Sequence, residues 1–221
     1  ERAYRLAYAV YAAQGYVQES PTEWVVRSYD SNKETFTVIA EDPEGRPAGT
    51  ISLYFDSPLG LPCGLGYPKE LDLLRRQGRR AAEVTRLVMA HCHRHSKLLL
   101  VALYNAISAY ARRVAKADDF LIEVHPRHAE FYTRLLSFER LGGECACSHV
   151  QGSPAILLRL KLDLQAEVIR EIGGGRKGTG SSPVRSLYSK FVAYEAEQEL
   201  LRPLLAEHRA MSGEERSYFS L

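Results

Sequence analysis

The segment AAEVTRLVMA, residues 81–90, places Glu83 and Arg86 inside an otherwise apolar run. Charged side chains are costly to bury unless they are paired. Val84, Thr85 and Val88 favour a strand. In a strand, Glu83 and Arg86 lie on opposite faces and cannot simply pair with each other. If the segment is instead a helix, positions i and i+3 are neighbours and an ordinary surface ion pair suffices.

On the strand interpretation, the Glu83 carboxylate has a use as a general base. An amine attacks a thioester only as the free base, and an α-ammonium group has a pKa of roughly 7.7–8.0. A carboxylate can accept its proton directly or through water. Arg86 could hold a carboxylate of the acceptor or of a neighbouring side chain in a bidentate grip. The competing structural interpretation of Arg86 is a core salt bridge to Asp72 or Glu70.

The elements that must position these residues follow from hydrophobic periodicity and turn residues. The expected fold is α/β, with one mixed, largely antiparallel sheet flanked by helices and a C-terminal amphipathic helix. The pattern predicts helices over 2–15, 69–80, 97–117 and 127–138. It predicts strands over 23–30, 35–41, 47–57, 81–90, 118–126, 139–150 and 154–163, the first three of them antiparallel. Within 69–80, Leu71 and Leu74 are expected to point inward and the four arginines outward.

Composition places the chain among globular proteins. Of its 221 residues, 45% are hydrophobic and 25% charged, and the net charge is +2. No apolar run approaches the length of a membrane span. Nucleic acid is a poor partner, since the basic residues lack interleaved aromatics. The four cysteines form no C-x-x-C pair, which favours reduced thiols in a cytoplasmic protein.

Three blocks carry a family resemblance: GTISLYFDSPLGLP, then KELDLLRRQGRRAAEVTRLVM, then VHPRHAEFYTRLLSFERLG. In this order they resemble the long-chain N-acyl amino acid synthases of the GNAT acyltransferase superfamily, which are similar in turn to the acyl-homoserine-lactone synthases. The resemblance covers roughly residues 1–165. It implies transfer of a long-chain fatty acyl group from acyl carrier protein to the amine of an amino acid.

The resemblance also implies roles for individual residues. Glu83 matches the acidic position at the reaction centre, and Tyr132 matches the tyrosine that can protonate the leaving thiolate. A buried tyrosine with a satisfied hydroxyl is an equally good interpretation of Tyr132. A backbone N–H within 87–91 is expected to bind the oxyanion. His128 either caps its helix or contacts pantetheine.

The segment after Met89, HCHRHSKLLL, lacks the glycines with which GNAT enzymes bind the coenzyme A pyrophosphate. We therefore expect no tightly bound cofactor, and a phosphopantetheine arm as donor, whose single phosphate could meet Arg94, His95 and Lys97. The loop SPLGLPCGLGYP, residues 57–68, and the apolar strand faces could border an acyl groove. No carboxylate or cysteine completes a metal site around the alternating histidines of 91–95, so no metal is expected.

The run RRQGRR contains Arg75, Arg76, Arg79 and Arg80 without an acidic neighbour inside it. It is either a solvated helix face or a docking patch for the acidic carrier protein. Two functional alternatives remain at this stage. One is synthesis of an acyl-homoserine-lactone autoinducer, and the other is a non-catalytic module that binds an acyl group or carrier protein.

The expected domains are an acyltransferase domain over 1–165, a short helix and glycine-rich linker over 166–186, and a helical tail over 187–221. The linker GGGRKGTGSSPVRS lacks the G-K-[ST] ending of a phosphate-binding loop. In the tail, Leu187, Phe191, Tyr194 and Leu201 share one side, and Pro203 is expected to kink or split the helix.

Overall fold

The computed structural model describes residues 1–147, 152–177 and 186–207. Its centre is a six-stranded sheet in the order β1-β2-β3-β4-β6-β5. The strands are β1 (Phe36–Glu41), β2 (Pro47–Phe55), β3 (Ala81–Met89), β4 (Asp119–Val124), β5 (Glu139–Cys147) and β6 (Ser153–Lys161). The helices are α1 (Arg2–Ala13), α2 (Pro68–Arg76), α3 (Lys97–Tyr110), α4 (Ala129–Leu136), α5 (Leu162–Ile172) and α6 (Glu197–Glu207).

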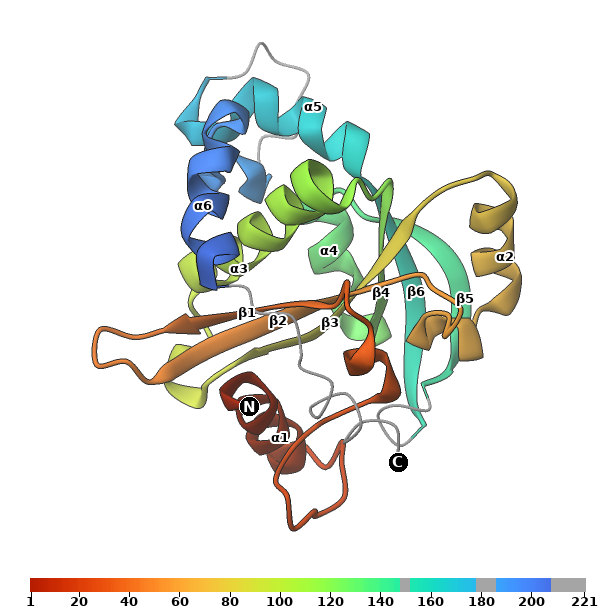
Figure 1. The fold of residues 1–221 in the computed structure, drawn as a ribbon. Coiled ribbons are helices and arrows are strands. Elements are labelled where there is room, and N and C mark those ends of the chain that lie inside the picture. Colours follow the sequence, from red (N-terminus) through yellow and green to blue (C-terminus); the bar gives the residue numbers. More distant parts are fainter. Residues whose placement is uncertain (148–151, 178–185, 208–221) are drawn as a thin grey trace.

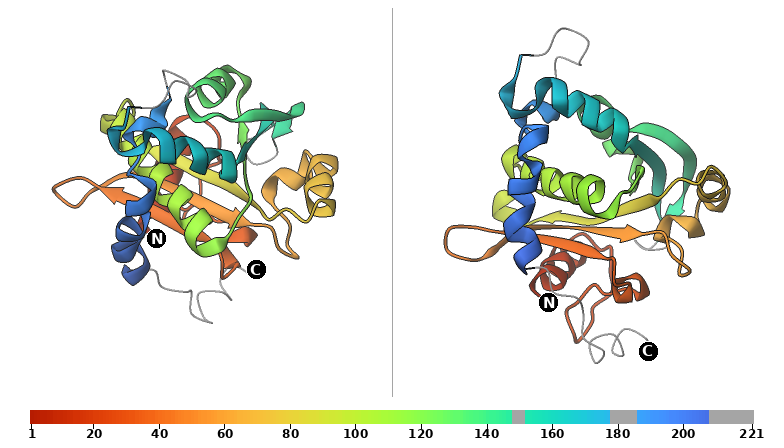
Figure 2. Two further views of the ribbon diagram at one scale, coloured as in Figure 1. Left: turned by 90° about the horizontal axis from the view of Figure 1, so that it is seen from above. Right: turned by 45° about the horizontal axis from the view of Figure 1, so that its top comes forward.

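The helices cover both faces of the sheet. Helix α1 lies against one face, and α3 lies against the other, with α5 and α6 further out on the α3 side (Figures 1 and 2). Helix α3 is apolar around most of its circumference, and residues 100–111 are all buried except Ala102. It can therefore pack against the sheet and the outer helices at once.

The expected mixed, largely antiparallel sheet is confirmed, since β3 and β4 form the one parallel pair between its strands. The strand expected over 23–30 is wrong. Residues Ser28–Ser31 form a 3-10 turn, in which Asp30 N donates to Arg27 O at 2.9 Å and Arg27 N donates to Asp30 Oδ2 at 2.8 Å. The turn is needed because it brings Asp30 into the interior, where it is 1% exposed.

The C-terminal segment also differs from expectation. In place of one helix from residue 187, two 3-10 turns (Leu187–Lys190 and Tyr194–Ala196) precede α6. The first turn inserts Tyr188 into the main core, where its Oη donates to Leu136 O at 2.5 Å. Helix α6 runs through Pro203 without being split. Residues 178–185 of the expected linker and 208–221 of the expected tail lie outside the described residues.

The first glycine of the expected linker is packed. Gly173 is buried, and the exposed Gly174 donates through its N–H to Phe191 O at 2.7 Å. Glu197, at the start of α6, is 0% exposed and accepts from Arg113 Nε at 2.9 Å and from Arg112. The segment 186–207 therefore docks on the same core as the sheet.

Strands β3 and β4 pair over only three positions and then diverge. Their register runs from Ala81–Asp119 to Glu83–Leu121. Beyond this point β3 stays with β2 as far as Met89, and β4 stays with β6 as far as Val124. The divergence opens the sheet at Glu83 and gives side chains of both strands access to a common space.

Candidate active site

A β-bulge in β3 decides which face its charged residues occupy. Thr50 of β2 pairs with Val88, but Ser52 pairs with Thr85, so β3 carries one extra residue between these pairs. Arg86 sits in this bulge with a φ of 49°. Strict alternation is broken there, and Arg86 joins Glu83 on the face that carries Tyr54 and α1. The expectation that Glu83 and Arg86 lie on opposite faces is therefore wrong.

Arg86 pairs with a neighbouring side chain, and the partner is neither Asp72 nor Glu70. Arg86 is 2% exposed. Its guanidinium donates through Nη1 to Asp30 Oδ2 at 2.8 Å and through Nη2 to Asp30 Oδ1. Nε donates to Ser52 Oγ at 3.2 Å, and Nη1 also donates to Val25 O at 3.2 Å. This bidentate, fully buried pair leaves no carboxylate-binding fork for a substrate. Arg86 thus fixes the N-terminal segment to β3.

Glu83 is buried, and no cationic side chain of the described residues lies at ion-pair distance from it. It is 3% exposed, and its Oε2 accepts a hydrogen bond from Cys63 N at 2.8 Å. Burial is the largest influence on its carboxyl, and with the nearby charge of Glu123 it outweighs the hydrogen bonds from Cys63 and the charge of Arg27. The pKa of Glu83 is raised from 4.5 to about 8.

Glu83 opens into a cavity of about 390 Å³ between the diverging strands. The walls come from α1, β3, α3, β4, α4 and the ends of β5 and β6. Apolar side chains supply part of the lining: Val10, Val84, Leu87, Val88, Met89, Ile122, Val124, Pro154 and Ala155. Polar and aromatic side chains supply the rest: Tyr11, Gln14, Tyr16, Arg27, Glu83, Thr85, Arg86, Arg94, Tyr104, Glu123, His125, His128, Tyr132, Cys147 and Ser153.

Glu123 is a second cavity carboxylate that the sequence analysis missed. It follows Asp119 and Leu121 on the β4 face shared with Glu83, whereas Phe120 and Ile122 point to the main core. Cys147 Sγ donates to its Oε2 at 3.7 Å. Burial is the main cause that raises the pKa of Glu123. Alternation within DDFLIEV was a signal for its place on this face.

Tyr132 and His128 line the cavity from the α4 side. The Tyr132 ring lies 6.4 Å from that of Tyr104, centroid to centroid. Burial raises the pKa of Tyr132 to about 12, so the phenol keeps its proton at neutral pH. His128 has a lowered pKa because of burial and the charges of Arg127 and His125. Both residues therefore line the cavity, and their roles stay predictions.

Arg94 reaches the cavity from the segment between β3 and α3. Its Nε donates to His95 Nε2 at 3.0 Å, and its Nη1 contacts His91 Nε2. His95 and Lys97 are exposed beside it and do not line the cavity. The expected loop 57–68 contributes no lining residue either, and it reaches the site only through the Cys63 amide.

The expectation of four outward arginines is wrong for Arg79. Leu71 and Leu74 do point inward, but Arg79 lies beyond α2 and binds the fully buried Asp119 through Nη2 at 2.9 Å. Arg80 binds Glu34 at 2.9 Å, and Arg75 binds Asp56 at 2.7 Å. Arg76 is exposed, with no ion pair in the part of the chain that the structure describes.

The described ranges contain no group of three or more His, Cys, Asp or Glu that could hold a metal ion. No described helix combines the length and apolar character needed to cross a bilayer.

Comparison with known proteins identifies the family. The family model for the N-acyl amino acid synthase FeeM matches residues 2–161. The solved structure of FeeM, an N-acyl amino acid synthase from uncultured soil microbes, is 27% identical with a TM-score of 0.64, covering 74% of this chain and 91% of that chain. No curated protein sequence matches the chain.

Acyl-homoserine-lactone synthases share the fold. The coenzyme A-dependent synthase BjaI, solved with SAM and isopentyl-CoA, is 15% identical with a TM-score of 0.56, covering 90% of each chain. The synthase LasI is 14% identical with a TM-score of 0.55, covering 73% of this chain and 81% of that chain. At these identities the likeness concerns the GNAT-like fold alone. The chain therefore belongs to the FeeM family of N-acyl amino acid synthases and is an acyltransferase.

Proposed function

We propose that this acyltransferase moves a long-chain fatty acyl group from acyl carrier protein to the amine of an amino acid. The observation that carries the proposal is Glu83, a buried carboxyl with no ion pair among the described residues, which opens into a cavity where the sheet diverges. The proposed donor would place the reaction in the cytoplasm.

Glu83 is the proposed general base. Its pKa of about 8 is close to that of an α-ammonium group, roughly 7.7–8.0. Transfer of the ammonium proton to the carboxylate is then nearly balanced in free energy. A base whose pKa lies near the working pH is also the most effective compromise between ionised fraction and proton affinity.

The remaining steps use groups on the other walls. Glu83 passes this first proton to solvent, and the free amine attacks the thioester carbonyl. The second proton of the amine then goes to the Glu83 carboxylate as the C–N bond forms. A backbone N–H of residues 87–91 is the proposed oxyanion donor. As the C–S bond breaks, Tyr132 donates its proton to the leaving sulfur, and the tyrosinate then regains a proton from solvent. Its pKa of about 12 keeps Tyr132 protonated before this step. The product is an N-acyl amino acid and a free thiol, formed by direct transfer.

The apolar part of the cavity supports a long acyl chain as substrate. Leu87 and Met89 on β3 and Val124 on β4 line the same cavity as Glu83. Each buried methylene contributes about 0.8 kcal/mol, so a chain of several carbons gains more here than an acetyl group. This favours long-chain donors by many-fold.

The carrier arm is proposed to enter where Arg94 and His128 line the cavity. Arg94, His95 and Lys97 then meet its phosphate, and no nucleotide site is required. For carrier docking, we propose the exposed residues Arg75 and Arg76 at the end of α2. Arg76 has no ion pair among the described residues, and Arg75 is partly exposed beside it.

The test is product identification by mass spectrometry. The protein is given long-chain acyl carrier protein, long-chain acyl-coenzyme A or acetyl-coenzyme A, each with mixed amino acids and with S-adenosylmethionine. We expect N-acyl amino acids, formed fastest from the acylated carrier protein. Acyl-homoserine lactone as the product, or efficient use of acetyl-coenzyme A with none of the carrier protein, would overturn the proposal.

A further inference from the structure

Arg27 lies on the wall of the cavity and has no acidic partner among the described residues. Its half-buried side chain lines the same space as Glu83, and its Nη1 donates to Thr85 Oγ1 at a long 3.4 Å. The guanidinium of Arg86, which also lines the cavity, is already bound by the Asp30 carboxylate. A guanidinium offers five N–H donors, and the structure shows a partner for one atom of the Arg27 fork.

The backbone of Arg27 is held by hydrogen bonds, whereas its guanidinium group has few partners. Arg27 N donates to Asp30 Oδ2 at 2.8 Å, and Asp30 N donates to Arg27 O at 2.9 Å. Asp30 is held in turn by Arg86 and by Tyr54 Oη at 2.9 Å. The buried ion pair between Asp30 and Arg86 thus fixes the backbone position of Arg27. A side chain on a fixed backbone loses less conformational entropy when a ligand binds.

Electrostatics place this guanidinium near the proposed base. Its charge lowers the pKa of both Glu83 and Glu123, against the larger opposing effect of burial. Arg94, the other cavity arginine without an ion pair among the described residues, is not among the main influences on either pKa. Arg94 is exposed and held between two histidines. Arg27 is therefore the cation best placed to act beside Glu83.

An amino acid acceptor carries a carboxylate one carbon away from its amine. A guanidinium binds a carboxylate through two parallel N–H···O bonds, which fixes orientation as well as position. We propose that Arg27 binds the carboxylate of the acceptor, so that the enzyme selects amines bearing a free α-carboxylate and directs the amine to Glu83. This inference rests on the proposed function, because it assigns the acceptor end of the same site.

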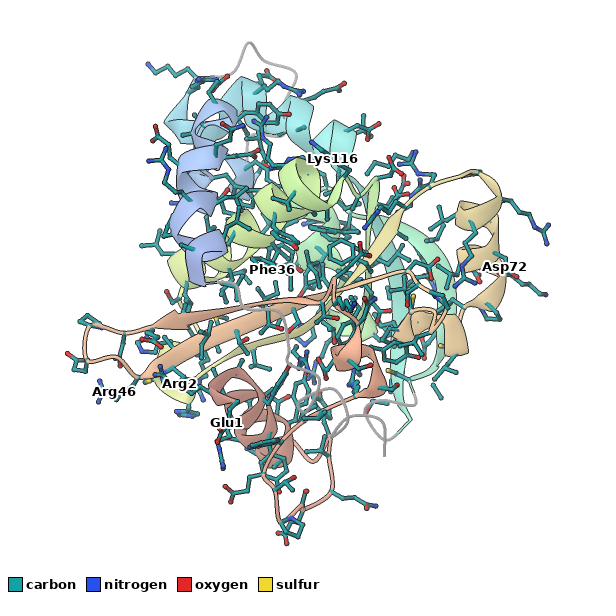
Figure 3. The ribbon with its side chains drawn as sticks, viewed as in Figure 1. Glu1, Arg2, Phe36, Arg46, Asp72 and Lys116 are labelled. Carbon is teal, nitrogen blue, oxygen red and sulfur yellow. The ribbon has the colours of Figure 1, made fainter. Side chains whose placement is uncertain are left out.

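The experiment compares acids with amides. Each free L-amino acid and its amide are offered as acceptors with long-chain acyl carrier protein to wild type, Arg27→Gln and Arg27→Lys. Arg46→Gln is the control, because Arg46 lies at the tip of the β1–β2 hairpin, away from the cavity (Figure 3). Thermal unfolding of each variant checks that it is folded.

Charged hydrogen bonds lost at such a site lower kcat/KM by about 10- to 100-fold. We expect Arg27→Gln to lose this factor for the acids, mostly through a higher KM, and to leave the amides nearly unchanged. Arg27→Lys should recover part of the preference, and Arg46→Gln should behave as wild type. An unchanged acid preference in Arg27→Gln, or an equal loss for acids and amides, overturns the inference and leaves the proposed function intact. Wild type that acylates no amino acid overturns both.

Discussion

Two charged groups three residues apart on β3 have opposite surroundings. Arg86 is buried with a bidentate carboxylate, a hydroxyl and a backbone carbonyl around its guanidinium. Among the described residues, Glu83 has hydrogen bonds from Cys63 and no cation at ion-pair distance. Both are nearly inaccessible, at 2% and 3% exposure. Burial alone therefore does not distinguish them, but the number of satisfying partners does.

The difference separates a charged group that stabilises the fold from one that can take part in the reaction. A satisfied ion pair keeps its protonation state and holds two chain segments in one register. An unpaired buried carboxyl has a pKa shifted toward neutrality and can exchange a proton at working pH. The same contrast recurs on β4, where Asp119 binds Arg79 and Arg159 and Glu123 faces the cavity with a thiol.

The largest expected effect is on chemistry at Glu83. Glu83→Gln keeps an acceptor for the Cys63 amide but removes the base, so kcat should fall by about 10²–10⁴-fold. Steady-state turnover of acylated carrier protein measures it, with circular dichroism to show that the fold is retained. Wild-type turnover at neutral pH excludes Glu83 as the base.

The next effect is on stability at Arg86. Arg86→Met leaves Asp30 buried without its cation, and the free energy of unfolding should drop by about 3–5 kcal/mol. Urea titration measures it. Arg75→Met, which breaks a partly exposed pair with Asp56, is the matched control and should cost no more than about 1 kcal/mol. Equal losses in the two variants contradict the structural role.

A smaller effect connects the two cavity carboxyls. The charge of Glu123 raises the pKa of Glu83, so Glu123→Gln should lower it and move the acid limb of the pH–kcat profile to lower pH. Glu44→Gln, in the turn between β1 and β2, should leave the limb in place. A limb that moves to higher pH, or does not move, shows that the two groups are not coupled in this way.

The smallest effect is at the surface of α2. Arg76→Glu should weaken binding of acyl carrier protein by about two- to five-fold, because exposed charges contribute about 0.2–1 kcal/mol. Binding of wild type should also weaken as salt is added. Arg134→Glu on α4 is the charge-matched control. Affinity that changes neither with Arg76→Glu nor with salt removes this patch from the docking surface.

Local patterns were enough to predict most of the fold. The periodicity of 97–117 and 127–138 gave two helices, and β-branched content gave the strand at 81–90. The prediction of a strand over 23–30 was wrong because Trp24, Val25 and Val26 are partly or fully buried without pairing with another strand. The tail failed because Tyr188 and Phe191 are held by tertiary contacts that local sequence does not contain.

The site was predicted in part. Glu83, Tyr132, His128 and Arg94 do line one cavity. The partner of Arg86 was missed because Asp30 lies 56 positions away and because one extra residue in β3 turns Arg86 to the other face. A bulge changes every face beyond it and leaves no mark in a pattern of alternation.

The central claim is that Glu83 is a buried carboxyl whose pKa is raised close to neutral pH. The pKa of Glu83 is about 8 in the folded chain and 4.5 ordinarily. Its burial therefore lowers the free energy of unfolding, and this loss becomes larger as pH rises from 4.5 to 8. The direct measurement is a ¹³C NMR titration of the side-chain carboxyls, with the Glu83 signal assigned by its absence in Glu83→Gln. A midpoint near 8 is the result predicted here. A midpoint near 4.5, the ordinary value for glutamate, would contradict it.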